Sequence, residues 1–184
     1  MAVTTHDTEL LFQFRDPLTK DRAFTAIIKK YQEKLYWHIR RIVVSHEDAN
    51  DVLQNVFIRV WNGLSNFRED AQLYTWLYRI ATNECLTFLD QQKKKSTVSM
   101  NDVESGLSNK ILADKYFDST KLEWKLQLAI QHLPEKQRIV FNLRYFDDMP
   151  YEEMSRVLET SQGALKASYH HAVKKVEEFI LREE

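Results

Sequence analysis

The chain has 184 residues, 43% of them hydrophobic, and a formal net charge of −1. A single cysteine, Cys85, excludes an internal disulfide framework, and the near-neutral charge excludes a uniformly basic nucleic-acid-binding protein. With only 3 Gly and 3 Pro, and without an apolar run of about 20 residues, the composition predicts a helical protein without a membrane span.

The N-terminal sequence MAVTTHDTEL is polar and lacks the basic start of a signal peptide. Together with the lone cysteine, this predicts a cytoplasmic location for the chain. Because the net charge is near zero, any contact with nucleic acid must come from local patches.

The first predicted helix lies in RAFTAIIKKYQEKLYWHIRRIV, which begins at Arg22. Apolar residues recur there at three- and four-residue spacing, the pattern of an amphipathic helix. They are Phe24, Ile27, Ile28, Tyr31, Leu35 and Ile39.

A second helix is predicted to follow Ser45, which stands three residues before Asp48 in a pair typical of a helix start. Its sequence DANDVLQNVFIRVWNGL has one apolar face, formed by Ala49, Val52, Leu53, Val56, Phe57, Val60, Trp61 and Leu64. The polar residues off that face are Asp48, Asp51, Gln54, Asn55 and Arg59.

The third predicted helix, LYTWLYRIATNECLTFLDQQKKK from Leu73 to Lys95, is apolar or aromatic around most of its circumference and ends in three lysines. A helix that only joins a core needs one apolar stripe. Aromatic stacking surfaces beside positive charge are typical of proteins that bind single-stranded DNA. Two plainer alternatives remain: Trp76 and Tyr78 serve only packing, and the lysines form a solvated helix end.

Residues 96–120 are rich in Ser and Asn and lack periodicity, which predicts a flexible linker. Residues 121–184 are helical again. A short helix in YEEMSRVLE, the break TSQ and a longer helix in GALKASYHHAVKKVEEFIL give the outline of a helix-turn-helix motif.

The longer helix has two faces of different character. Its apolar face contains Leu165, Tyr169, Ala172, Val176, Phe179 and Ile180. Its opposite side, near the N-terminal half, carries Lys166, Ala167, His170, His171 and Lys174, as a recognition helix requires. Gly163 lacks a side chain and would let the backbone approach a DNA strand closely. A solvated surface is the alternative for the two histidines.

These sequences are similar to those of extracytoplasmic-function sigma factors, the small promoter-recognition subunits of bacterial RNA polymerase in the sigma-70 family. DVLQNVFIRVWNGLSNF with YTWLYRIATNECLTFL resembles their second conserved region. LPEKQRIVFNLRYFDDMPYEEMSRVLETSQGALKASYHHAVKK resembles their fourth region. The resemblance spans nearly the whole chain, and the motifs stand in the family's order.

The resemblance implies an all-α protein of two small helical domains joined by a flexible linker: region 2 in residues 1–95, the linker in 96–120 and region 4 in 121–184. The first domain would bind the polymerase clamp and melt the minus-10 element. The second would bind the polymerase flap and read the minus-35 element as duplex DNA. The family also implies an anti-sigma factor as a partner, although no motif here identifies one.

Site residues follow from the motifs by position. The polymerase-binding set is Asp48, Asp51, Gln54, Asn55 and Arg59. The minus-10 set is Phe67, Trp76, Tyr78, Arg79, Asn83, Lys93 and Lys94, with Phe67 and Asn83 at positions that hold an unstacked base. The minus-35 set is Gly163, Lys166, Ala167, His170, His171 and Lys174.

Two alternative function classes make different demands on the sequence. A stand-alone helix-turn-helix regulator would bind palindromic duplex DNA without polymerase. An all-α enzyme would need a phosphate-binding loop, a metal cluster or a nucleophile with its base, and the sequence offers none of these patterns. We therefore predict no catalytic residue, cofactor or metal site.

Overall fold

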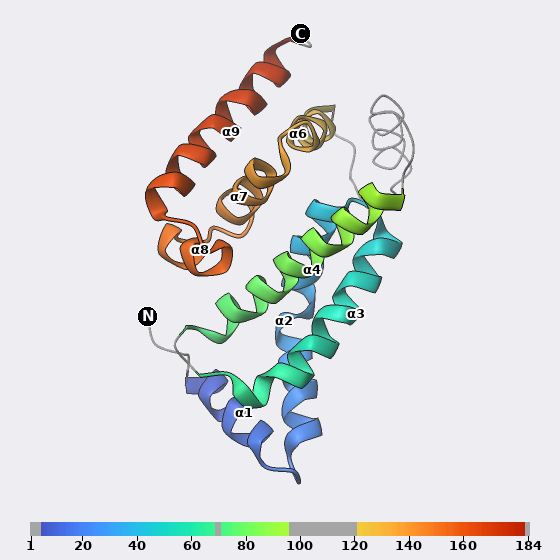
Figure 1. Cartoon of the computed structure of the whole chain (residues 1–184), viewed down its shortest axis with the longest axis vertical. Coiled ribbons are helices and arrows are strands. Elements are labelled where there is room, and N and C mark those ends of the chain that lie inside the picture. Colours follow the sequence, from blue (N-terminus) through green and yellow to red (C-terminus); the bar gives the residue numbers. More distant parts are fainter. Residues whose placement is uncertain (1–4, 69–70, 96–120, 183–184) are drawn as a thin grey trace.

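The computed structural model describes residues 5–68, 71–95 and 121–182, and its regular structure in these ranges is helical (Figure 1). The first block contains α1 (Thr5–Arg15), α2 (Lys20–Val43), α3 (His46–Gly63), the 3-10 helix η1 (Leu64–Asn66) and α4 (Leu73–Lys95). The second block contains α6 (Lys121–Gln131), α7 (Glu135–Tyr145), α8 (Tyr151–Leu158) and α9 (Gln162–Arg182). The predicted all-α class is confirmed. The predicted linker, 96–120, lies outside the described residues.

Helix α1 is not among the helices predicted from the sequence. Its inward residues Leu10, Leu11 and Phe14 are buried, but Phe12 between them is exposed, which obscures the helical periodicity. A polar contact fixes α1 to α2. The carboxylate of Asp7 accepts hydrogen bonds from the Lys30 ammonium at 2.6 Å and the Tyr31 hydroxyl at 2.9 Å.

Helix α3 forms as the sequence predicts. The Ser45 side chain caps it by accepting a hydrogen bond from the backbone N–H of Asp48 at 3.3 Å. Val52, Val56 and Val60 are buried on its apolar face. The polar face therefore points away from the core.

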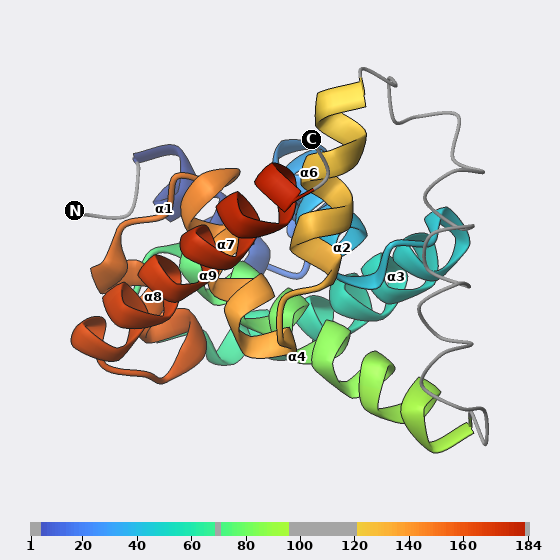
Figure 2. The ribbon, with the colours of Figure 1, turned by 90° about the horizontal axis from the view of Figure 1, so that it is seen from above.

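Helix α4 is packed on two sides. It lies against α2 and α3 on one side and against α8 on the other. Figure 1 shows it on the side of the first block that faces the second block, and Figure 2 gives the view from above. Leu73, Leu77, Ala81 and Cys85 are fully buried in the core. Its unusually wide apolar surface is thus used for packing within the first block and between the blocks.

The second block is built around α7, in which five consecutive residues, Ile139 to Leu143, are buried. A helix buried around most of its circumference must have neighbours on several sides. Helix α9 lies on one side of α7, and α2 contacts it from the first block. The turn between α8 and α9 passes through Glu159, which has a left-handed backbone with φ 51°.

The largest hydrophobic core of the described residues includes side chains from both blocks. It contains residues of α1 to α4 together with a set from the second block: Ile139, Val140, Leu143, Met149, Met154, Val157 and Leu165. A second, smaller cluster lies between α6, α7 and α9 and includes Ile130, Phe141 and Val176. The helix-turn-helix motif is therefore held against the first block in this arrangement.

The contact between α1 and α2 generates a stability prediction. Burial, and then the bond to Asp7, raise the pKa of the Tyr31 hydroxyl above its ordinary value of 10.0. The protonated form therefore contributes stability below pH 10, and that contribution is lost as the pH rises further. Tyr31→Phe should lower the free energy of unfolding by about 1 kcal/mol at neutral pH. It should also make the decline of stability above about pH 10 shallower.

Urea unfolding between neutral and alkaline pH measures both effects. Tyr145→Phe is the matched control, since the Tyr145 side chain is 53% exposed. Equal stability and equal alkaline slopes for Tyr31→Phe and wild type would contradict the assigned role of this hydroxyl.

Candidate polymerase and DNA interfaces

The polar face of α3 is an exposed surface. Asp51, Gln54, Asn55 and Arg59 are all exposed, and Asp48 is half-buried in the first turn. Arg59 forms an ion pair with Glu84, a buried residue of α4, and this pairing orients the guanidinium along the surface. The structure thus brings together the residues that the sequence predicts to bind polymerase.

An apolar residue lies within this polar surface. Ile58 is 52% exposed and lines a groove of about 310 Å³ between α3 and α4, together with Asn55, Arg59 and Phe88. Ile58 is not among the residues that the sequence predicts for this surface. An isoleucine off the apolar face of an amphipathic helix is the signal that could have identified it, because exposed apolar residues mark interaction surfaces when they gather with polar ones.

The minus-10 set does not form one open surface. Arg79, Asn83, Lys93 and Lys94 are exposed, and Trp76 is half-buried. Trp76, Arg79 and Asn83 follow one another at three- and four-residue spacing and therefore share a face of α4. This row is the part of the predicted minus-10 surface that has the expected geometry.

Phe67 and Tyr78 differ from the expectation that both face a melted strand. Phe67 is only 7% exposed, and its ring packs on Trp76 with ring centroids 5.2 Å apart. Trp76 also lies over Gly63, where an added Cβ would come within 3.2 Å of the indole. Phe67 is buried because its ring packs against the Trp76 ring. It therefore offers no open face to a base in this arrangement.

Tyr78 is buried by the second block. Its hydroxyl donates a hydrogen bond at 3.3 Å to the carboxylate of Asp147, in the turn between α7 and α8. Burial, and then the negative charge of Asp147, raise the pKa of Tyr78 above its ordinary value. The tyrosine stays protonated as the donor in this contact.

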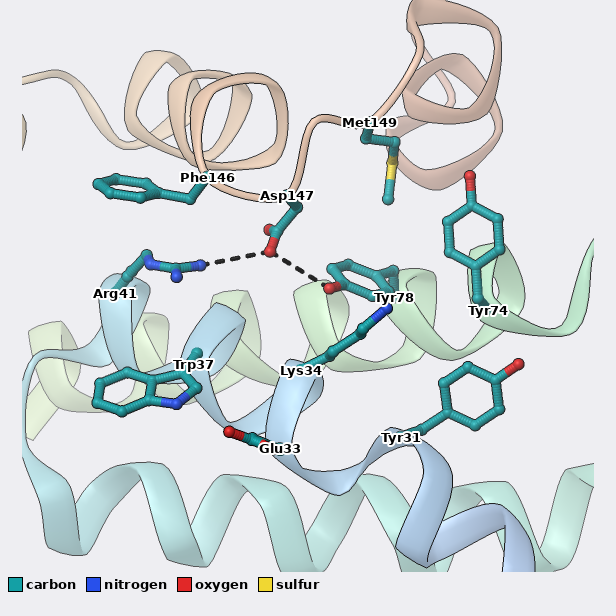
Figure 3. A pocket seen from close by; sticks show the side chains of 10 residues that line it. All are labelled: Tyr31, Glu33, Lys34, Trp37, Arg41, Tyr74, Tyr78, Phe146, Asp147 and Met149. Carbon is teal, nitrogen blue, oxygen red and sulfur yellow. Dashed lines mark hydrogen bonds and ion pairs between the residues drawn. The ribbon is translucent and has the colours of Figure 1, made fainter.

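Asp147 joins several groups of the first block. The Arg41 guanidinium donates to it at 3.3 Å, and one ring nitrogen of His38 lies 3.2 Å from its other oxygen. His38 is fully buried, and its second ring nitrogen lies 3.0 Å from the Thr82 hydroxyl. Figure 3 shows Asp147 between Arg41 and Tyr78, with the Phe146 ring beside Arg41. The Asp147 carboxylate is therefore a link between α2, α4 and the second block.

A cavity of about 510 Å³ lies next to this contact. Its lining comes from α2, α4 and the turn before α8, so it belongs to the junction of the two blocks (Figure 3). Sequence reasoning does not predict it, because its walls are brought together only when the blocks pack.

The minus-35 set forms one exposed face of α9. Gly163, Lys166, Ala167, His170, His171 and Lys174 are all exposed. Leu165, Ala172 and Val176 are buried on the opposite side. The arrangement that the sequence predicts for a recognition helix is therefore present and remains open to a partner.

Two further features of the described residues bear on function. In the ranges 5–68, 71–95 and 121–182, no group of three or more His, Cys, Asp or Glu could hold a metal ion. Cys85 is buried, and burial raises the pKa of its thiol. A buried thiol with a raised pKa is a poor nucleophile, so Cys85 acts as a core residue.

None of the helices that the structure describes combines the length and the apolar character needed to cross a lipid bilayer.

Comparison with protein families gives two matches that together cover most of the chain. A family described as Sigma-70 region 2 matches residues 27–95, which include α3 and α4. A family described as Sigma-70, region 4 matches residues 123–176, which include the helix-turn-helix motif.

Curated relatives resemble the chain over most of its length. The RNA polymerase sigma-H factor of Pseudomonas aeruginosa is 33% identical over 159 residues, covering 82% of each chain. The ECF RNA polymerase sigma-E factor of Escherichia coli is 30% identical over 159 residues, covering 82% of this chain and 83% of the relative.

Two solved structures share the fold. CnrH, determined in complex with the cytosolic domain of CnrY, gives a TM-score of 0.71 at 20% identity and covers 97% of this chain and 99% of its own. The sigma factor RpoE of Bartonella quintana, in complex with the anti-sigma factor NepR, gives a TM-score of 0.68 at 16% identity. That match covers 88% of this chain and 98% of RpoE.

Proposed function

Because this chain belongs to the extracytoplasmic-function branch of the sigma-70 family, we propose that its two helical blocks divide promoter recognition between them. As a sigma factor, the chain binds core RNA polymerase and directs promoter-specific initiation of transcription. In the proposed division, residues 1–95 bind the clamp and the minus-10 element, and residues 121–184 bind the flap and the minus-35 element. Residues 96–120 connect them.

The observation that carries this division is the presence of two separate exposed faces of different character. The face of α3 is polar with mixed charge, whereas the face of α9 carries lysines and histidines without an acidic residue among them. A mixed surface with an apolar residue suits a protein partner, and a basic helix face suits DNA.

The chain is a regulator of transcription initiation. We propose that it has no reaction of its own, because the polymerase supplies the chemistry of RNA synthesis. We also propose that the chain is located in the cytoplasm, where a bacterial polymerase meets promoter DNA.

An anti-sigma factor is a further proposed partner. The support is that RpoE of Bartonella quintana was crystallised with the anti-sigma factor NepR.

The polymerase-binding role of α3 predicts a selective loss. Asp51→Arg combined with Gln54→Ala should weaken binding to core polymerase at least about tenfold, because both side chains would lie in the interface. The two residues are exposed, so thermal unfolding of the isolated chain should be unchanged. Affinity is measured by fluorescence anisotropy of labelled protein with core enzyme.

The control for this double variant is Asp21→Arg with Gln32→Ala, which makes the same substitutions at exposed positions of α2. If the α3 variant bound core polymerase with wild-type affinity, α3 would not be part of the interface.

The minus-35 role of α9 predicts a base-dependent effect. Lysine can donate to guanine in the major groove, whereas a contact to phosphate carries no sequence information. If Lys166 reads a base, Lys166→Ala should lower run-off transcription and relax preference at one promoter position by about 1–3 kcal/mol. If it contacts phosphate, binding should weaken on every sequence and depend less on salt.

Lys175→Ala is the matched control, because Lys175 is an exposed lysine of the same helix that bonds to Gln137 of α7. If Lys166→Ala left transcription unchanged from promoters with every minus-35 sequence, Lys166 would be a solvated surface residue.

The minus-10 role predicts a defect in strand opening. The Asn83 amide offers a donor and an acceptor to the edge of an unstacked base, an edge that paired DNA does not present. Asn83→Ala should leave core binding and closed-complex formation nearly intact and reduce permanganate reactivity of promoter thymines. A premelted promoter should restore only part of the run-off product. The assignment would be withdrawn if Asn83→Ala opened duplex promoters as wild type does.

A further inference from the structure

Two histidines stand next to each other on the exposed face of the recognition helix. His170 and His171 of α9 are both exposed, and their ring centroids lie 6.1 Å apart. In the part of the chain that the structure describes, neither ring takes part in a hydrogen bond or an ion pair. The ring nitrogens of both histidines are therefore available to a binding partner.

The two rings point toward different sides of this face. Consecutive residues of an α-helix are about 100° apart around its axis, because one turn takes about 3.6 residues. A helix with its side chains is about 10–12 Å across and the major groove is about 12 Å wide, so both flanks of a recognition helix come close to phosphates. With α9 in the groove of the minus-35 element, His170 would therefore face one wall of phosphates and His171 the other.

Permanent positive charges lie one helical turn from each histidine. Lys166 stands four residues before His170, and Lys174 stands four residues after it and three after His171. Side chains at these spacings are neighbours on a helix surface. The histidines and lysines of the minus-35 set thus form one continuous surface, and a phosphate bound there would favour the charged form of each imidazole.

No carboxylate of the described residues is paired with either histidine. Helix α9 itself carries no Asp or Glu before Glu177. Helices α6, α7 and α8 pack against α9. The charged or titratable groups that they and the turn after α6 place beside it are Arg144 and Tyr145, near Tyr169, Tyr151, near Lys166, and His132, near Phe179. The acidic residues of α8, Glu152 and Glu153, are paired with Arg156.

The charge of this surface depends on pH. Histidine is the side chain that ordinarily changes its charge between about pH 5 and pH 8. With both imidazoles neutral, the minus-35 set has the two positive charges of Lys166 and Lys174, and with both protonated it has four. The logarithm of DNA affinity falls with the logarithm of salt concentration by about 0.9 for each neutralised phosphate. Protonation of both histidines should therefore steepen that slope by about 1.8.

We propose that His170 and His171 are proton-dependent phosphate contacts of the recognition helix, through which binding of the minus-35 element tightens as the pH falls. The inference rests on the proposed function, because it uses the assignment of α9 to the minus-35 element. It adds a form of regulation to that surface, since acidification strengthens the hold on duplex DNA without a change of fold. The minus-10 set contains no histidine and is not affected in this way.

Promoter binding at two pH values tests the proposal. Core polymerase carrying the full-length chain is titrated with a fluorescent promoter duplex from which it initiates transcription, at about pH 6 and about pH 8 and at several salt concentrations. Wild type should bind about tenfold more tightly at the lower pH, and with the steeper salt slope. The pair His170→Gln and His171→Gln should lose both changes.

A charge-retaining variant separates charge from shape. The pair His170→Lys and His171→Lys is positive at both pH values, so it should show the steeper salt slope at both and respond to pH no more than the glutamine pair does. His6→Gln, which removes an exposed histidine of α1, is the matched control and should keep the wild-type response to pH. A shorter duplex without the minus-35 element measures the response of the remaining contacts, and on it wild type and the glutamine pair should respond equally.

The two duplexes separate failure of the inference from failure of the proposed function. If the minus-35 element tightened binding but wild type and the glutamine pair shared one dependence on pH and salt, the histidines would be solvated surface residues and the inference would be overturned. A pH response confined to one minus-35 sequence would also overturn it, because phosphate contacts carry no sequence information. If removal of the minus-35 element left wild-type affinity unchanged, the assignment of α9 in the proposed function would itself be wrong.

Discussion

Helix α4 must satisfy packing partners on two sides, and most of the arrangement follows from that constraint. One side supplies Leu77 and Ala81 to a core shared with α2 and α3. The other side presents Thr75 and Tyr78 to the second block, where water is largely excluded. Polar groups in such a place must be paired. The carboxylates of Glu153 and Asp147 provide those pairs, and they thereby fix where α8 and its preceding turn rest.

The same constraint explains why the junction differs from an ordinary hydrophobic core. Apolar residues such as Met154 and Leu165 contribute contact area, while the ion pair between Arg41 and Asp147 adds little net stability. Interfaces between parts of one chain that move are typically more polar than permanent ones. The two blocks therefore pack in a defined way without forming the kind of surface that would hold them together under all conditions.

The local sequence pattern was sufficient to predict the exposed residues of a helix that packs on only one of its sides. In α3 and α9, apolar residues sort to one face, so the exposed residues Asn55 and Lys166 could be identified without a structure. The outline of the helix-turn-helix motif also depends only on nearby residues. Helix α1 was not predicted because the exposed Phe12 lies among its buried apolar residues and obscures the helical periodicity of the sequence.

The junction could not be predicted, because it depends on residues far apart in the chain. Asp147 bonds to Tyr78 across 69 positions and to His38 across 109 positions. Nothing in the sequence near Asp147 distinguishes it from a solvated turn residue. Tyr78 is predicted to bind DNA from its position in the region 2 motif. An aromatic side chain that its own block does not bury gives the same sequence pattern whether its partner is a base or another helix.

The packing of α4 on two sides has a consequence for biosynthesis. A ribosome adds about 5–20 residues per second, so about 4–14 s separate the synthesis of Lys95 from that of Leu165, which lines a pocket together with Leu86 of α4. During this interval the nascent first block presents the apolar and aromatic surface that later lies beneath α8. Such a surface is a substrate for chaperones on the emerging chain, and the speed of translation through residues 96–165 sets how long it remains available.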